Sequence, residues 1–283
     1  MKRIVRTLQI ISFSFLGLAA CNNSRQSTTE FSEEVHDTTT FLRSDRSVKK
    51  DTITYETIFF PEDTTYMAKV LTKGTFHSDE VWQTAEKENW FGVFKGLNDN
   101  YLSNVEVKTP RVFDVVLDED STKNKTGWEV IPANKDSCYL LISGLKFLTN
   151  HKIKSLILSK ISIFPDEQLQ IKYLGIDYNV FAKGEKIRSI DSPESFEVRN
   201  YKLYLSAMKD GQIVNELLAS IPNFDDAMVQ ILFAGDIDGD GLLDLIIDTS
   251  RHYNVSSPTL YLSKPADKGH LLKVVGQHTS VGC

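Results

Sequence analysis

The alternation of apolar and polar residues at period two is the feature that most restricts the fold of this chain. From about residue 53 onward, short segments of this kind, such as 168–173 and 196–205, are separated by glycines and other turn residues. Because successive side chains of a strand point to opposite faces, this period is typical of antiparallel strands with one buried face. The sequence therefore predicts a mainly β fold: an antiparallel, sandwich-like domain with minor helix.

The expected strands cover most of the central part of the chain. Two other stretches, 78–89 and 212–220, favour short helices, the first with Ser78 as its capping residue. With 283 residues, of which 41% are hydrophobic, the chain has enough apolar surface for a core, which excludes the disordered class. The expected strands are 90–94, 105–107, 112–116, 139–142, 155–164, 168–173, 178–182 and 196–205.

The first twenty residues have the composition of a secretion signal. Three basic residues precede an uncharged apolar stretch at 8–20, and two alanines then lead to Cys21. As a helix this stretch spans about 20 Å, which is short of the roughly 30 Å hydrocarbon core of a bilayer. The segment resembles the lipobox of bacterial lipoproteins. The resemblance implies that residues 1–20 are a lipoprotein signal peptide and that Cys21 is the lipidation site.

The same resemblance implies a lipid-anchored protein of the cell envelope. Asn22 stands where the sorting rule of enteric bacteria has Asp for inner-membrane retention, so the outer membrane is favoured over the inner one. Cleavage changes the net charge from −6 to −9, because residues 1–20 hold three basic and no acidic residues. An acidic surface gains nothing from anionic headgroups, and the lipid is therefore the expected membrane attachment. Which face of the membrane the protein occupies stays open.

The mature chain divides by composition into three parts. Residues 21–52 are rich in Ser, Thr, Asn and charge, and they cannot bury enough apolar surface to offset the entropy of ordering. We expect this part to be a flexible tether. A β-rich domain at 53–205 and a C-terminal segment at 206–283 follow, and the two pack either as separate units or as one domain.

Four aspartates within nine residues form the sharpest chemical pattern of the chain. Asp236, Asp238, Asp240 and Asp244 occupy loop positions 1, 3, 5 and 9, and Gly241 at position 6 permits a sharp bend. Calcium takes six to eight hard oxygen ligands, and this spacing turns carboxylates toward one centre. Without a cation the carboxylates would repel one another. The pattern predicts a calcium site, and the alternative is an acidic turn without metal.

The surroundings of the loop distinguish it from an EF-hand. Position 12, which requires Glu, is Ile247, and both flanks are strand-like rather than helical. The loop resembles the DxDxDGxxDL calcium loop of FG-GAP and VCBS-type repeats, which joins two strands. The resemblance implies that the carbonyl of Leu242 joins the four aspartates as a ligand. It also implies a C-terminal hairpin unit, in which 244–248 pairs with 259–262 and a structural calcium ion rigidifies the hairpin.

The remaining cysteines and the histidine nearest the loop are weaker candidates. Cys138 and Cys283 are candidates for a disulfide, which requires Cα atoms within about 7 Å; the alternative for Cys138 is a buried thiol. His252 is expected to be a loop histidine, because calcium sites rarely use imidazole. The three tryptophans are expected in the core rather than on a carbohydrate-binding face.

The charge and the absence of catalytic motifs argue against two functional classes, nucleic-acid binders and enzymes. A pI near 5.6 argues against a nucleic-acid partner, which requires a basic surface. The chain has no GxSxG, HExxH, P-loop or GxGxxG motif, and this argues against an enzyme. The leading hypothesis is a binding or assembly role at the envelope, with an envelope protein or a glycan as partner. The alternative is an envelope hydrolase acting on glycan or peptide through carboxylates that no spacing reveals.

Overall fold

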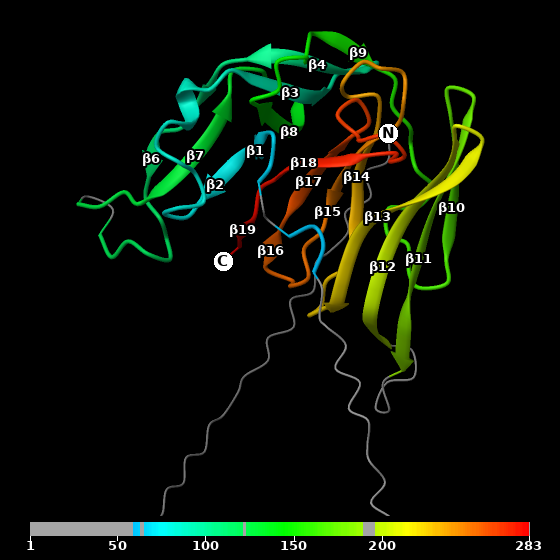
Figure 1. Ribbon diagram of the computed structural model, residues 1–283. Coiled ribbons are helices and arrows are strands. Elements are labelled where there is room, and N and C mark those ends of the chain that lie inside the picture. The colour runs from blue at the N-terminus through cyan, green and yellow to red at the C-terminus, as the bar shows by residue number, and fades with distance from the viewer. Residues whose placement is uncertain (1–58, 63–64, 121–122, 189–195, 283) are drawn as a thin grey trace, which may run out of the picture. The chain divides into compact units, whose positions relative to one another are not determined.

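Every sheet in the described part of the chain is built by antiparallel pairing of strands (Figure 1). The computed structural model describes residues 59–62, 65–120, 123–188 and 196–282. These ranges contain nineteen strands and one short 3₁₀ helix, η1 (Ala85–Lys87). The mainly β fold predicted from the alternation is therefore confirmed. None of the helical structure in these ranges has the length and apolar character of a membrane span.

A four-stranded sheet formed by the C-terminal part of the chain is buried on both faces. On β15, Leu245 and Ile247 belong to one hydrophobic core, whereas Ile246 between them belongs to another. Such burial on both faces explains why this segment is a continuous apolar run rather than an alternating one. The order of the sheet is β14 (Gln230–Gly235), β15 (Asp244–Asp248), β17 (Pro258–Leu262) and β18 (Lys273–Gln277).

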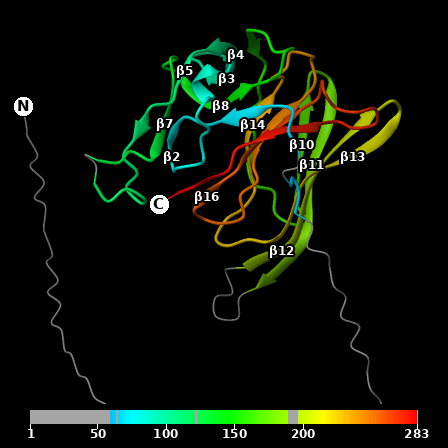
Figure 2. The ribbon, with the colours of Figure 1, turned by 60° about the vertical axis from the view of Figure 1, so that its left-hand side comes forward.

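A meander of long strands covers one face of this sheet (Figure 2). Two-residue turns at 174–175 and 210–211 have positive φ at both positions, the geometry that fits the twist of a hairpin. Tyr201 and Leu218 of the meander share a core with Tyr261, whose hydroxyl donates a hydrogen bond to the Leu218 carbonyl oxygen at 2.5 Å. The strands are β10 (Gln168–Tyr173), β11 (Ile176–Arg188), β12 (Phe196–Lys209) and β13 (Gln212–Asn223).

A five-stranded sheet formed by the N-terminal part of the described chain packs on the opposite face. Leu140 and Ile142 of this sheet share a core with Ile246 and Leu260. Its order is β1 (Lys69–Leu71), β8 (Ser137–Ser143), β3 (Trp90–Lys95), β4 (Asn100–Val105) and β9 (His151–Ile153). The central sheet is thus enclosed between two others, while Leu232 on its edge strand β14 stays exposed.

A third core lies between the five-stranded sheet and a smaller one. It contains Trp90 and Trp128, both buried, with Trp82 packed against it, so the expected core position of the tryptophans is confirmed. The smaller sheet consists of β2 (Gly74–Phe76), β5 (Val107–Lys108), β6 (Arg111–Val112) and β7 (Gly127–Pro132). A separate pair joins β16 (Val255–Ser256) to β19 (Ser280–Val281).

The expected division at 205/206 falls inside a single strand. β12 runs through that position, and its partner β13 lies beyond it. The core between the meander and the central sheet also draws buried residues from both sides of the division. In the described residues, the ranges 53–205 and 206–283 therefore share a hydrophobic core.

Both helix predictions are wrong. The stretch 212–220 lies within β13, which pairs with β12 along nearly its whole length, so the available ladder overrides local helix propensity. Within 78–89 only the single 3₁₀ turn η1 forms. The indole of Trp90 donates to the carbonyl oxygen of Ala85 at 2.7 Å, which ties this turn into the third core.

Two strand predictions are also wrong. The stretch 112–116 leaves β6 after Val112, because the carboxylate of Asp114 accepts hydrogen bonds from the N–H groups of Val116 and Leu117 and folds a turn. The stretch 155–164 forms no strand and makes one isolated bridge, Ser155 to Gly235. The peptide N–H of Leu156 and the carbonyl oxygen of Ile161 also form single hydrogen bonds to β14, so this stretch lies beside a strand without forming a regular ladder with it.

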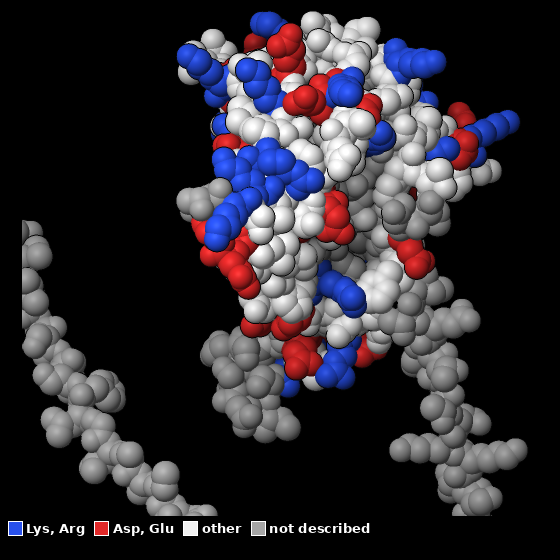
Figure 3. All heavy atoms as spheres, turned by 90° about the vertical axis from the view of Figure 1, so that its left-hand side faces the viewer, with Lys and Arg blue, Asp and Glu red and all other residues white. Residues whose placement is uncertain are grey.

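The surface carries charges of both signs. On the face shown in Figure 3, acidic and basic side chains lie close beside one another. One group of basic side chains lies together at the left of this face, and acidic side chains lie below it. The absence of a nucleic-acid partner stays a prediction from composition.

Candidate metal centre

The aspartate loop connects two paired strands, as its sequence pattern predicts. β14 ends at Gly235 and β15 begins at Asp244, and these two residues face each other across the antiparallel ladder. The pairing of β15 with β17 confirms the predicted C-terminal hairpin as well. The pairing therefore brings loop positions 1 and 9, which are eight residues apart in sequence, together where β14 ends and β15 begins.

The first aspartate folds the loop around its own side chain. One carboxylate oxygen of Asp236 accepts hydrogen bonds from the N–H groups of Gly239 at 2.7 Å and Asp240 at 3.0 Å. The other accepts the N–H of Gly241 at 2.9 Å. Gly241 has φ +86°, a conformation that side chains disfavour, and this confirms the sharp bend expected at position 6.

The last aspartate is fully buried and ties the loop to the strand next to it. Asp244 is 0% exposed. One of its oxygens accepts the N–H groups of Ile237 at 2.7 Å and Asp238 at 3.1 Å. The other accepts the N–H of Ser263 at 2.7 Å and its hydroxyl at 2.9 Å. Ser263 directly follows β17, so this carboxylate connects both ends of the hairpin.

Asp238 is buried with one oxygen left without a partner. The residue is 3% exposed, and its Oδ2 accepts the N–H of Lys264 at 3.0 Å. Its Oδ1 has no hydrogen-bond partner in the described part of the chain. Burying a charged oxygen without a partner is costly, and such groups call for an unseen water or ion. One carboxylate oxygen each of Asp236, Asp238 and Asp244 lie within 4.8 Å of one another.

Burial and mutual repulsion raise the pKa of two carboxylates of the cluster. Burial, with the charge of Asp240 adding to it, raises the pKa of Asp238 to about 6. Burial also raises the pKa of Asp244 well above its usual range, and the charge of Asp238 contributes in the same direction. A divalent cation among these oxygens would favour the charged forms and oppose both shifts.

Two of the predicted ligands lie beside the cluster rather than within it. Asp240 is exposed, its Oδ1 accepts the N–H of Leu242 at 2.8 Å, and both its oxygens lie 3.0 Å from the hydroxyl oxygen of Ser263. Leu242 is half-buried. The geometry thus brings three of the four carboxylates together, while the roles of Asp240 and of the Leu242 carbonyl as ligands stay predictions.

Sequence reasoning missed four residues that surround the loop. Ser263 and Lys264 donate to Asp244 and Asp238, and the predicted hairpin could have indicated them, since they directly follow its second strand. The hydroxyl of Tyr173 accepts the N–H of Asp236 at 3.0 Å, and Nε2 of His151 lies 3.3 Å from the Asp236 carbonyl oxygen. No local pattern marks these two, which reach the loop only through the packing of β9 and β10.

The other predicted site residues lie elsewhere. Cys138 is half-buried on β8, and burial raises the pKa of its thiol to about 12. Cys283 and Cys21 lie outside the described residues, so the disulfide and the lipidation stay predictions. His252 follows β15 at the end away from the aspartate loop, and its Nε2 pairs with a carboxylate oxygen of Asp225 at 2.7 Å.

Comparison with known proteins gives the chain no family. No protein-family model matches it, and neither the curated proteins nor the solved structures contain a significant match.

Proposed function

We propose that this chain is a lipid-anchored protein of the cell envelope with a binding role, and that its aspartate loop holds one structural calcium ion. The observation that carries the calcium proposal is the buried Oδ1 of Asp238, which lacks a partner in the described chain while belonging to a residue of the three-carboxylate cluster. A cation bound to this oxygen would satisfy it and neutralise its neighbours.

Calcium suits this loop better than magnesium. The donors are carboxylates and a backbone carbonyl, which are hard oxygens, and calcium accepts them in irregular numbers and geometries. Magnesium demands a near-ideal octahedron and retains several waters. Extracytoplasmic calcium sites often have dissociation constants on the order of 10⁻⁴ to 10⁻³ M, so a structural ion would stay bound outside the cell.

The ion would stabilise the junction of three strands. Asp236 follows β14, Asp244 begins β15, and Ser263 and Lys264 follow β17. An ion held between Asp236, Asp238 and Asp244 links the first two directly and the third through hydrogen bonds to Ser263 and Lys264. The central sheet contributes residues to two hydrophobic cores. An ion that orders the ends of these three strands would therefore stabilise the packing on both faces of the sheet.

Thermal unfolding with and without calcium tests the ion. The melting temperature should rise with added calcium and fall with EDTA in the unaltered protein. Asp238→Asn should abolish that response, because it removes the partnerless anionic oxygen. The control is Asp177→Asn, an exposed aspartate on β11 outside the loop, which should keep the full response. Equal curves in calcium and EDTA would exclude a structural ion.

Metabolic labelling tests the anchor. The lipobox pattern at Cys21 carries this part of the proposal. Expressed in a bacterium supplied with labelled palmitate, the protein should incorporate label and fractionate with membranes. Cys21→Ser should do neither, whereas Cys138→Ser, the control cysteine on β8, should behave like the unaltered protein. Label retained by Cys21→Ser would contradict lipidation at that residue.

A further inference from the structure

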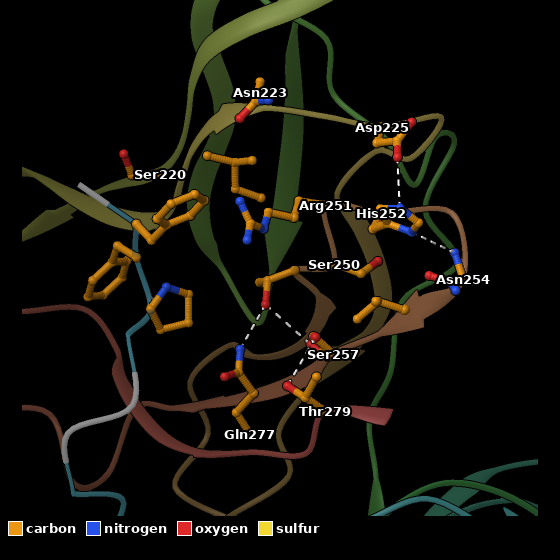
Figure 4. A pocket seen from close by; sticks show the side chains of 16 residues that line it. Ser220, Asn223, Asp225, Ser250, Arg251, His252, Asn254, Ser257, Gln277 and Thr279 are labelled. Atoms are coloured by element: carbon orange, nitrogen blue, oxygen red, sulfur yellow. Dashed lines mark hydrogen bonds and ion pairs between the residues drawn. The ribbon is translucent and has the colours of Figure 1, made fainter. Parts of the chain in front are cut away.

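A pocket of about 810 Å³ lies at the end of β15 opposite to the aspartate loop (Figure 4). One side is formed by 249–252, which directly follow β15, and other sides come from the end of β13 and from 59–61. The volume is in the range of small-molecule sites, about 300–1,000 Å³. Half of its sixteen lining residues have neutral hydroxyl or amide side chains, which can both donate and accept hydrogen bonds.

The pocket contains the positive charge of Arg251. The guanidinium of Arg251 lies over the ring of Phe59, 4.4 Å from its centroid. In the described part of the chain Arg251 forms no ion pair with a carboxylate. Figure 4 shows the guanidinium projecting into the pocket, with Asn223 on one side of it and Gln277 on the other. This contact holds the guanidinium beside the ring, and its N–H groups suit a planar anion such as a carboxylate.

Asp225, the acidic residue that lines the pocket, contacts His252 rather than Arg251 through its carboxylate. A carboxylate oxygen of Asp225 lies 2.7 Å from Nε2 of His252, and the peptide N–H of Asp225 donates to the Arg251 carbonyl oxygen at 2.8 Å. Asp225 is thus fixed against the neighbouring loop by both contacts. The carboxylate of Asp225 thus faces His252, whereas the guanidinium of Arg251 faces no carboxylate of the described chain, so an anionic group of a ligand is the partner expected for the guanidinium.

Several polar side chains that line the pocket are hydrogen-bonded to one another or to their neighbours. Gln277 donates to the hydroxyls of Thr249 at 3.0 Å and Thr259 at 2.9 Å. The hydroxyls of Ser257 and Thr279 lie 3.2 Å apart. Since these groups hold one another in place, a ligand meets a preorganised surface and orders little on binding.

Other polar groups of the pocket are free to bind a ligand. The side chains of Asn223 and Ser250 have no hydrogen-bond partner within the described residues, and Figure 4 places both at the pocket. Apolar area for the C–H face of a ring is offered beside them by Phe60. A guanidinium, several hydroxyl-binding groups and an aromatic side chain together match an anion that also carries hydroxyls.

We propose that this pocket binds a sugar that carries a carboxylate. Arg251 binds the carboxylate, Asn223 and Ser250 bind ring hydroxyls, and the volume admits a short oligosaccharide. The proposal rests on the binding role proposed above and names its ligand class, but it does not depend on the ion, since the pocket and the loop lie at opposite ends of β15.

Titration calorimetry with trigalacturonate, and with maltotriose as its neutral counterpart, tests this assignment on the purified protein in calcium. Trigalacturonate should bind and maltotriose should bind at least tenfold more weakly. Arg251→Gln should weaken trigalacturonate binding about tenfold or more, because a charge-assisted pair is lost. The matched control is Arg111→Gln, an arginine that also lies over an aromatic ring, that of Trp128 at 3.5 Å, outside the pocket. It should bind like the unaltered protein.

Three results would overturn the assignment. They are no binding of trigalacturonate, equal binding of the two sugars, and unchanged binding by Arg251→Gln. Tighter binding of glucose 6-phosphate than of glucuronate would overturn the choice of a carboxylate over a phosphate. The calcium response of the melting temperature, measured on the same samples, separates failure of this proposal from failure of the structural ion.

Discussion

The carboxylate of Asp244 accepts two hydrogen bonds from Ser263, one from the peptide N–H at 2.7 Å and one from the hydroxyl at 2.9 Å. Nineteen positions separate the two residues, and the Ser263 hydroxyl also lies 3.0 Å from both carboxylate oxygens of Asp240. The aspartate loop is therefore not a free turn, because it is attached to the end of the strand that pairs with β15.

Removing the buried carboxylate should be more destabilising than removing its hydroxyl partner. Asp244→Ala leaves three N–H donors and a hydroxyl without their acceptor, and we expect a loss of about 3 kcal/mol in the free energy of unfolding. Ser263→Ala removes only the hydroxyl, and about 1 kcal/mol is expected. Urea unfolding at saturating calcium measures both. A larger effect of Ser263→Ala would contradict the assigned role of Asp244.

Two glycines of the hairpin should respond to alanine for different reasons. Gly241 has φ +86° and open space around it, so Gly241→Ala should cost about 1 kcal/mol through backbone strain alone. A Cβ on Gly235 would lie 2.6 Å from the carbonyl oxygen of Lys154, and the adjoining backbone would have to move. Gly235→Ala should therefore destabilise more than Gly241→Ala in urea unfolding. A larger destabilisation by Gly241→Ala than by Gly235→Ala would contradict the close contact between Gly235 and the backbone of 154–155.

A buried histidine should make stability depend on pH. Nε2 of His278 lies 2.9 Å from the carbonyl oxygen of Glu80, its ring packs on Phe76, and its Nδ1 is buried without a partner in the described chain. Burial lowers the pKa of His278. Below the unfolded value of about 6.5 the unfolded chain binds more protons than the folded one. Stability should therefore fall as the pH falls from 7 toward 5, by at most about 1.4 kcal/mol per unit.

The pH dependence can be assigned by substitution. His278→Gln should flatten the fall in unfolding free energy between pH 7 and 5, even though it also lowers stability at pH 7. The control is His270→Gln, an exposed histidine beside Glu216, which should retain the slope. An unchanged slope in His278→Gln would place the responsible group elsewhere.

The sequence predicted well those features that depend on local pattern. The segments 168–173 and 196–205, where the alternation predicts strands, form β10 and β12. The aspartate loop joins two strands, and its bend and its four carboxylates are encoded within nine residues. The helix expected at 212–220 failed for a tertiary reason. β12 offers this segment a long hydrogen-bonding partner, which no local pattern reports.

Contacts between distant segments could not be predicted. Tyr173 and His151 reach Asp236 only because two outer sheets pack on the central one, at sequence separations of 63 and 85. The pocket around Arg251 is likewise assembled from four segments, and the lone arginine after β15 has no motif to mark it. Such constellations depend on packing, which periodicity and spacing do not encode.

The central claim is that the loop of Asp236, Asp238 and Asp244 binds one calcium ion. The most direct measurement is a calorimetric titration of calcium into the purified, EDTA-treated protein, alongside Asp238→Asn and the control Asp177→Asn. We predict one ion per chain for the unaltered protein and for Asp177→Asn, and no binding for Asp238→Asn. An absence of calcium binding to the unaltered protein, or equal binding by Asp238→Asn, would contradict the claim.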